Sequence, residues 1–404
     1  MLMLIAWRNI WRNRKRSLII LAAVAFGIWA GLFSMGLMNG MYDQMIATGV
    51  STRLGHIQIH TPDFRERPDV TKTIPDGPAV LQQVRGRDDV LAAAGRSVVS
   101  GMATSPETAT GVTVLGIDPA ADAGVFDVAE YILEGDWFQT DRRNPIVIGA
   151  KLAERLDVRL GKKVVLQGQS PDGSIGAGAF RIVGIFRTPS SAFDETTVFA
   201  IQDDIQRVFG LGQAIHEIVL RLAEHEDIGT VQLALQQAHP DLAVETWKEL
   251  APELAVTADL GNQMLYIFMI IILLALIFGI TNTMLMGVLE RIRELGVLKA
   301  LGMKSGRMFA MVLLETLVIS LFGGLVGIFA GAGTIEIFAR LGIDLSVVSE
   351  GMAEFGMGNI VYPVLEWMAY LHVTVLVVLT ALVSAVYPGI KAVRLNPIKA
   401  IRTY

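Results

Sequence analysis

The sequence predicts an α-helical membrane protein with four transmembrane helices and a large mixed α/β domain inserted between the first and the second. Charged residues make up only 18% of the 404 residues, whereas soluble proteins average about 25%. The deficit is confined to four apolar stretches, which together contain a single charged side chain, Glu315; they are 17–42, 260–289, 308–335 and 367–390. The long segment 43–259 between the first two has the charge content of a soluble domain.

Each apolar stretch is long enough to span a bilayer, because a helix needs about 20 apolar residues to cross about 30 Å of hydrocarbon. The first stretch has two interpretations, a secretory signal or a membrane anchor. Its apolar run exceeds the roughly 7–15 residues of a signal core, and no small-x-small cleavage site follows it. We therefore expect an uncleaved anchor.

The charges also predict an orientation. Segments 1–16, 290–307 and 391–404 are strongly basic, whereas 43–259 carries an excess of acidic residues. Because Lys and Arg near span ends are retained on the cytoplasmic side, both termini and the middle loop are expected in the cytosol. The segments 43–259 and 336–366 are then periplasmic or extracellular, in a multi-pass protein of the inner (plasma) membrane. The acidic outer segment disfavours a nucleic-acid partner.

The outer segment shows the hydrophobic patterns of alternating strands and helices. Strands are expected at 55–60, 112–117, 145–149, 162–167, 180–186, 216–222 and 242–247, and helices at 150–156, 202–209 and 228–239. From Pro252 to Leu289 the sequence predicts one uninterrupted helix, of which 253–263 forms a stalk above the membrane. Residues 43–50 are expected to extend the first span in the same way.

The chain offers little for catalysis. It has no cysteine, no GxxxxGK[ST] nucleotide loop and no GxSxG nucleophile motif. The Gly-rich stretch 168–179 lies between two expected strands and predicts a hairpin connection. His56 and His60 would be about 13 Å apart on a strand, too far to share a metal ion, and are expected to be surface histidines. We predict no catalytic residue and no metal site.

Glycines recur at four-residue spacing in the first and third spans, at Gly27, Gly31, Gly323, Gly327 and Gly331. In lipid, such spacing lets helix backbones approach closely enough for dispersion to hold them together. The partner helix belongs either to a second subunit or to this chain, and the pattern leaves both possibilities open.

Glu315 lies about 10 Å inside the third span, at 1.5 Å per residue. An ionised carboxylate is costly there unless it is paired or reached by water. Glu315 either contacts a buried partner or a neighbouring subunit, or it leans back to the headgroup region or is protonated.

The middle loop, 290–307, alternates charged residues with apolar ones at helical spacing. This pattern predicts a short amphipathic helix along the inner membrane face, ending near Gly302. From the spacing alone, the loop either docks a partner or only connects two spans.

Several stretches resemble the FtsX/MacB-type permeases of ABC transporters. They are WRNIWRNRKRSLI before the first span, ERIRELGVLKALG after the second, LLETLVISLFGGLVGIFAG in the third and YPGIKAVRLNPIKAIR at the end. The outer stretch LEGDWFQTDRRNPIVIGAKLAERLDVRLGKKVVLQ is similar to the MacB-like periplasmic core domain. Four spans with one large outer loop look most like the lipoprotein-releasing LolC/LolE type.

The resemblance implies that 290–302 is a coupling helix seated in a groove of a cytosolic ATPase. The implied coupling residues are Glu290, Arg291, Arg293, Glu294, Leu295, Gly296, Leu298, Lys299, Leu301 and Gly302. It also implies that this chain binds no cofactor itself, and that ATP and Mg²⁺ are bound by a separate dimer of ABC ATPase subunits. A second copy, or a homologous permease subunit, completes the complex.

The implied function is that of a non-catalytic permease subunit. Mechanical motion of its periplasmic domain would release lipoproteins, or another hydrophobic envelope substrate, from the inner membrane. The alternative is an FtsX-like regulatory scaffold that activates an extracytoplasmic partner such as a cell-wall hydrolase. No residue in the sequence selects between these two functions.

Overall fold

The computed structural model describes residues 14–139, 142–223, 227–348, 351–352 and 357–396. Most of the expected N-terminal segment 1–16 lies outside the described residues, as do Lys399 and Arg402 of the tail. The chain divides into two compact units. One contains 1–42, 258–344 and 360–404, and the other contains 43–257 and 345–359.

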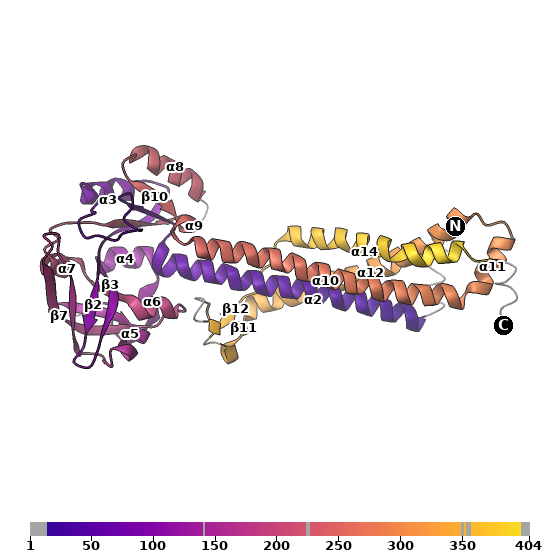
Figure 1. The fold of residues 1–404 in the computed structure, drawn as a ribbon, viewed down its shortest axis with the longest axis horizontal. Coiled ribbons are helices and arrows are strands. Elements are labelled where there is room, and N and C mark those ends of the chain that lie inside the picture. The colour runs from indigo at the N-terminus through magenta and orange to yellow at the C-terminus, as the bar shows by residue number, and fades with distance from the viewer. Residues whose placement is uncertain (1–13, 140–141, 224–226, 349–350, 353–356, 397–404) are drawn as a thin grey trace. The chain divides into compact units, whose positions relative to one another are not determined.

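Among the described residues, four helices are long and apolar enough to cross a membrane (Figure 1). They are α2 (Arg14–Gly49), α10 (Pro252–Glu290), α12 (Ser305–Leu341) and α14 (Trp367–Val393). They contain the four predicted stretches and extend past them. The continuous helix expected from Pro252 is confirmed, and α2 continues past residue 42 as expected.

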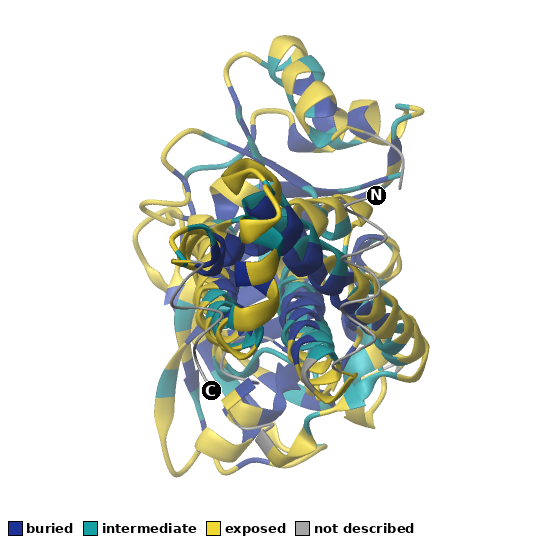
Figure 2. Ribbon diagram, turned by 90° about the vertical axis from the view of Figure 1, so that its right-hand side faces the viewer, coloured by how far each residue is buried: buried dark blue, intermediate teal, exposed yellow. Residues whose placement is uncertain are grey.

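Each membrane helix has a buried stripe and an exposed side (Figure 2). The stripes form one hydrophobic cluster, which includes Ile28, Leu32, Met269, Met311 and Val377. The exposed sides are apolar as well: Phe278 of α10 and Phe329 of α12 are 77% and 73% exposed. A helix that is apolar all round is typical of a membrane span, since lipid is as apolar as the bundle interior.

Short elements complete the membrane unit. Helix α11 (Ile292–Ala300) connects α10 to α12. After α12, strands β11 (Ile343–Asp344) and β12 (Ile360–Val361) pair in antiparallel fashion. The 3-10 turn that follows β11, η3 (Ser346–Val348), belongs to the other unit.

The other unit is mixed α/β. Its strands are β1 (Ile57–His60), β2 (Val90–Thr104), β3 (Ala109–Ile117), β4 (Ile132–Gly135), β5 (Pro145–Gly149), β6 (Lys163–Gln169), β7 (Ile175–Phe186), β8 (Thr197–Ile201), β9 (Glu217–Leu222) and β10 (Ala243–Thr246). Its helices are α3 (Gly77–Arg85), α4 (Pro119–Val125), α5 (Ala150–Arg155), α6 (Ser191–Thr196), α7 (Gln202–Phe209), α8 (Ile228–Ala238) and α9 (Trp247–Leu250), with a π turn η1 (Val50–Leu54) and a 3-10 turn η2 (Val128–Tyr131).

The strands form one sheet in the order β10-β1-β9-β2-β3-β8-β5-β7-β4, and β6 joins β7 back to β2. Six strands therefore close into a ring, β2-β3-β8-β5-β7-β6. Glycine is required where the ring closes, because a Cβ at Gly101 of β2 would collide with the carbonyl oxygen of Gln167 in β6. The ring of strands surrounds one hydrophobic core.

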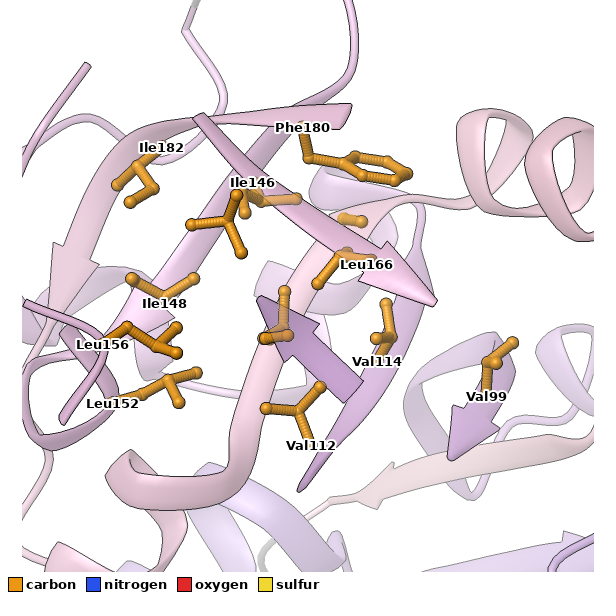
Figure 3. Packing of buried hydrophobic residues seen from close by; sticks show 14 of the residues in the cluster. Val99, Val112, Val114, Ile146, Ile148, Leu152, Leu156, Leu166, Phe180 and Ile182 are labelled. Carbon is orange, nitrogen blue, oxygen red and sulfur yellow. The ribbon is translucent and has the colours of Figure 1, made fainter. Parts of the chain in front are cut away.

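All six ring strands contribute to a single hydrophobic cluster, which α5 and α7 also join. Side chains such as Val112, Ile146, Leu166 and Phe180 converge in it (Figure 3). A second cluster lies against β10, β1, β9 and the first half of β2, where α3 and α8 pack on the sheet. The long strand β2 thus belongs to both cores.

The histidine expectation was wrong. His60 is 2% exposed, and its ring nitrogens lie 2.9 Å from the carbonyl oxygen of Thr61 and 3.2 Å from Oε2 of Glu245. His56 is half-buried, and its Nδ1 accepts a hydrogen bond from the backbone N–H of Leu222. Burial, and then the charge of Arg221, lowers the pKa of His56. Both rings therefore connect the residues of their strand segment to a neighbouring strand, β10 for His60 and β9 for His56.

The expected hairpin at 168–179 is confirmed, because β6 and β7 pair in antiparallel fashion around it. The expected strands and helices also occur, and each of their ends lies within five residues of its predicted position. Sequence reasoning missed β2, β4 and β8, and helices α3, α4, α6 and α9.

Candidate functional site

The candidate site is the turn between α10, α11 and α12, where the sequence places the coupling residues. Helix α10 ends at Glu290, and Arg291 breaks the helix with φ −104° and ψ 18°. Helix α11 is therefore shorter than the predicted segment 290–302, with Glu290 at the end of α10 and Leu301 and Gly302 beyond α11.

The end of α11 has the hydrogen bonds of a Schellman motif. The N–H of Met303 donates to the carbonyl of Leu298, and the N–H of Gly302 donates to that of Lys299. Gly302 has φ +91°, a conformation that side chains rarely adopt. The sequence correctly predicted the end of the helix near Gly302, because glycine terminates helices in this way.

One face of α11 is buried in the membrane unit. Leu295 is 4% exposed and joins the hydrophobic cluster of the spans, which also contains Val288 and Met308. Gly296 is buried as well, and Leu298 and Ile292 are half-buried. These positions fix the helix against the bundle.

The opposite face of α11 is exposed and mixes charge with apolar surface. Arg293 and Glu294 are exposed. Val297 is 41% exposed, and Leu301, just past the end of the helix, is 80% exposed. Sequence reasoning did not select Val297, although its spacing of four residues from both Arg293 and Leu301 places it on their face. We call these four residues the outer face of α11.

Glu315 has a partner within the chain. Nη1 of Arg291 lies 3.1 Å and 3.3 Å from the two carboxylate oxygens of Glu315, and both side chains are only 12% exposed. Nε of Arg291 also lies 3.5 Å from Oε2 of Glu294. A cavity of about 30 Å³ adjoins the pair and is lined partly by Ser17 and Met284. The residue that interrupts the helix between α10 and α11 is thus linked to the first third of α12.

Lys299 connects α11 to α14. Its Nζ donates to the carbonyl oxygens of Val393, at 2.7 Å, and Leu395, at 2.9 Å. Val393 is the last residue of α14. The last carbonyls of a helix lack partners inside the helix and carry partial negative charge, so a cation is favourable there.

The five predicted packing glycines all contact helices of this chain. Gly27 and Gly31 of α2 face α10, where a Cβ would approach Leu276 and Met269. The glycines of α12 face α2, as follows: Gly323 lies against Leu21 and Val24, Gly327 against Ala25 and Ile28, and Gly331 against Leu32. Helix α2 therefore packs between α10 and α12 through small residues on both sides.

The α/β unit holds a buried charged cluster. Arg96 and Asp122 are each 1% exposed and are joined by a bond of 2.7 Å, with Phe126 stacked on the guanidinium. Glu217 lies 3.7 Å from Arg96, and burial raises its pKa against the opposing effect of that charge. In the described part of the chain no group of three or more His, Asp or Glu side chains is arranged to hold a metal ion.

These features define a class first: a membrane protein with an α/β domain in the loop between its first two spans. The family described as MacB-like periplasmic core domain matches residues 17–238, and the family described as FtsX-like permease C-terminal matches residues 266–397. The chain therefore belongs to the FtsX/MacB family of ABC transporter permeases.

Three relatives illustrate the range of the family. An uncharacterized ABC transporter permease, MJ1507, of Methanocaldococcus jannaschii is 28% identical over 67% of this chain and 65% of its own length. The lipoprotein-releasing system transmembrane protein LolC of Neisseria meningitidis is 21% identical over 78% of this chain and 76% of its own length. The macrolide export ATP-binding/permease protein MacB of Bdellovibrio bacteriovorus is 24% identical over 96% of this chain, but over only 60% of its own length.

Among solved structures, the periplasmic region of MacB from Actinobacillus actinomycetemcomitans is similar to 54% of this chain and 95% of that chain. The identity is 12% and the TM-score is 0.36.

Proposed function

We propose that the chain is the non-catalytic permease subunit of an ABC transporter whose ATP and Mg²⁺ are bound by a separate cytosolic ATPase dimer. The observation that carries this proposal is the outer face of α11, on a helix whose other face is anchored in the bundle. Membership of a permease family supports it.

The outer face of α11 has the composition of a docking surface. Exposed apolar side chains at Val297 and Leu301 are flanked by the charged Arg293 and Glu294. Protein interfaces combine an apolar centre with a polar rim in this way. An ATPase groove that accepts one helix turn fits this surface.

The proposed orientation follows from the basic residues. Lys304 and Arg307 lie at the start of α12, and Lys391 and Arg394 at the end of α14. Because such residues are retained on the cytosolic side, they support an orientation with α11 on the ATPase side and the α/β domain outside the inner membrane.

The proposed mechanism is mechanical. Closure of the ATPase dimer would displace α11 and tilt the membrane helices, and two unbroken helices, α2 and α10, would carry the tilt past the ends of the spans. The α/β domain would then release a lipoprotein, or another hydrophobic envelope substrate, from the membrane. Likeness to LolC supports this client class.

The docking surface is tested by the double substitution Val297→Asp and Leu301→Asp. The full chain is purified in detergent, and co-purifying ATPase is identified by mass spectrometry and by its hydrolysis of Mg-ATP. We expect wild type to retain an ABC ATPase and the double variant to lose at least nine tenths of it. The control is Val347→Asp, because Val347 is 96% exposed in the other unit. Equal recovery in all three proteins refutes the docking role.

The client is tested separately. The purified complex is placed in proteoliposomes that contain a fluorescent triacylated lipoprotein, and Mg-ATP is added. ATP-dependent transfer of the lipoprotein to a soluble acceptor supports extraction. ATP hydrolysis without any transfer refutes the lipoprotein client and favours the regulatory scaffold.

A further inference from the structure

Two polar contacts connect α11 to the bundle, one at each end of the helix. At its start, Arg291 contacts Glu315 of α12. At its end, Lys299 donates to the carbonyls of Val393 and Leu395 at the end of α14. Lys299 lies on the side of the helix opposite to its outer face, so its contact remains available while a partner is bound. Arg291 precedes the first residue of α11 and contacts Glu294 of the outer face as well as Glu315.

The backbone alone does not make α11 a rigid extension of its neighbours. Arg291 has non-helical φ and ψ, so the hydrogen-bond ladder of α10 does not continue into α11. At the other end, Gly302 has a positive φ and the chain turns before α12 begins at Ser305. A helix flanked by two such breaks can tilt unless side chains hold it.

Both contacts define the position of α11 relative to its neighbours. The guanidinium of Arg291 reaches both oxygens of Glu315 in a site where each side chain is 12% exposed. Charge-assisted hydrogen bonds are short and directional, and separating a buried pair exposes an uncompensated charge. Lys299 satisfies two helix-terminal carbonyls at once, so its position is also defined.

We infer that Arg291, Glu315 and Lys299 are positioning residues that fix α11 to α12 and α14, so that a force applied to the outer face of α11 is transmitted directly to these two spans. The transmission of force rests on the proposed function, because it requires an ATPase docked on α11. The anchoring of α11 does not, because its contacts lie within this chain. Glu315 is then the residue of α12 through which this force reaches the helix.

The test measures the distance between α11 and α12 by double electron–electron resonance. Spin labels are attached at Ala300→Cys, which is exposed on α11, and at Ile337→Cys, which is 54% exposed on α12. The chain has no cysteine of its own, so only these positions are labelled. The label on α12 is remote from the anchoring pair, because Ile337 lies 22 residues beyond Glu315, about 33 Å along the helix at 1.5 Å per residue.

We expect one narrow distance distribution in the otherwise unchanged chain, and at least a twofold wider one in Glu315→Gln and in Lys299→Met. The matched control is Glu336→Gln, which removes an exposed ion pair with Arg340 from the same helix. A narrow distribution in both variants overturns the inference. A wide distribution in the control overturns it too, because the width would then not report the anchors.

A second variant separates positioning from folding. Replacing the buried pair by apolar residues, Arg291→Met with Glu315→Leu, removes the uncompensated charge and should restore stability in detergent. If the pair positions α11, the distribution stays wide although thermal stability returns. If stability and the narrow distribution return together, the pair only serves folding and the inference is overturned.

The same labels separate this inference from the proposed function. With the co-purified ATPase trapped by Mg-ATP and vanadate, the distance in the otherwise unchanged chain should stay the same, because α11 and α12 move together. In Glu315→Gln it should shift or widen further. If no ATPase binds at all, the proposed function fails, whereas the comparison without nucleotide still decides the anchoring.

Discussion

Gly327→Ala is expected to destabilise the membrane unit, because Gly327 lies where α12 contacts α2. A Cβ there would be 2.6 Å from the carbonyl oxygen of Ala25 and 3.0 Å from Cβ of Ile28. Contacts under 3.0 Å are essentially never observed, so the helices must separate by at least about 0.4 Å. Overpacking of this kind costs about 1–3 kcal/mol, and the gap weakens the dispersion contacts beside it.

The control is Gly333→Ala on the same helix, where a Cβ would meet nothing within 4 Å. Alanine there gains helix propensity of up to about 1 kcal/mol, so the two variants should differ by about 1–4 kcal/mol. The free energy of unfolding is measured by titrating the full chain from mild detergent into sodium dodecyl sulfate. Equal stability of the two variants refutes the close packing of α2 on α12.

Three further predictions concern charged groups. Burial raises the pKa of Asp194 to about 7 from its ordinary value of 3.8. The folded chain therefore keeps this proton to a higher pH than the unfolded chain does. As a result, the free energy of unfolding should fall by up to about 4 kcal/mol as pH rises from 4 to 7. Asp194→Asn should flatten this decline in denaturant unfolding of the full chain, and an unchanged slope contradicts it. Asp122→Ala leaves the guanidinium of Arg96 without its nearest carboxylate, which should lower the free energy of unfolding by about 3–5 kcal/mol. The double substitution Arg96→Met with Asp122→Leu should recover most of this loss. Equal losses in the single and the double variant would refute the role of charge. Lys299→Met removes two hydrogen bonds to the end of α14, so amide exchange of the last turn of α14 should accelerate about tenfold, whereas unchanged rates would show that the lysine is dispensable.

The spans and many outer elements could be predicted because each has a local signal. An apolar stretch of more than 20 residues with almost no charge is typical of a membrane span, and β5 and α7 occur at the predicted residues. Strand β2 had no such signal. Seven consecutive residues, 93–99, are buried, so apolar and polar positions do not alternate. Its alanines, glycines and serines are also weak strand formers.

The site was predictable only where it is local. The alternation of charged and apolar residues located α11, and Gly302 located its end. The contact between Arg291 and Glu315 joins residues 24 apart, and that between Lys299 and Val393 joins residues 94 apart. Such pairs depend on how the helices pack, which periodicity does not specify. The same holds for the glycines, whose spacing predicted close packing but left the partner helix open.

Site-specific photocrosslinking tests the central claim most directly. A benzophenone amino acid is placed at Val297, on the outer face of α11, and for comparison at Val347, which is 96% exposed in the other unit. The labelled full chains are irradiated in cell membranes and the adducts are identified by mass spectrometry. The proposed docking predicts an ABC ATPase adduct from position 297 and none from position 347. No ATPase adduct from position 297, or equal yields from both positions, would contradict it.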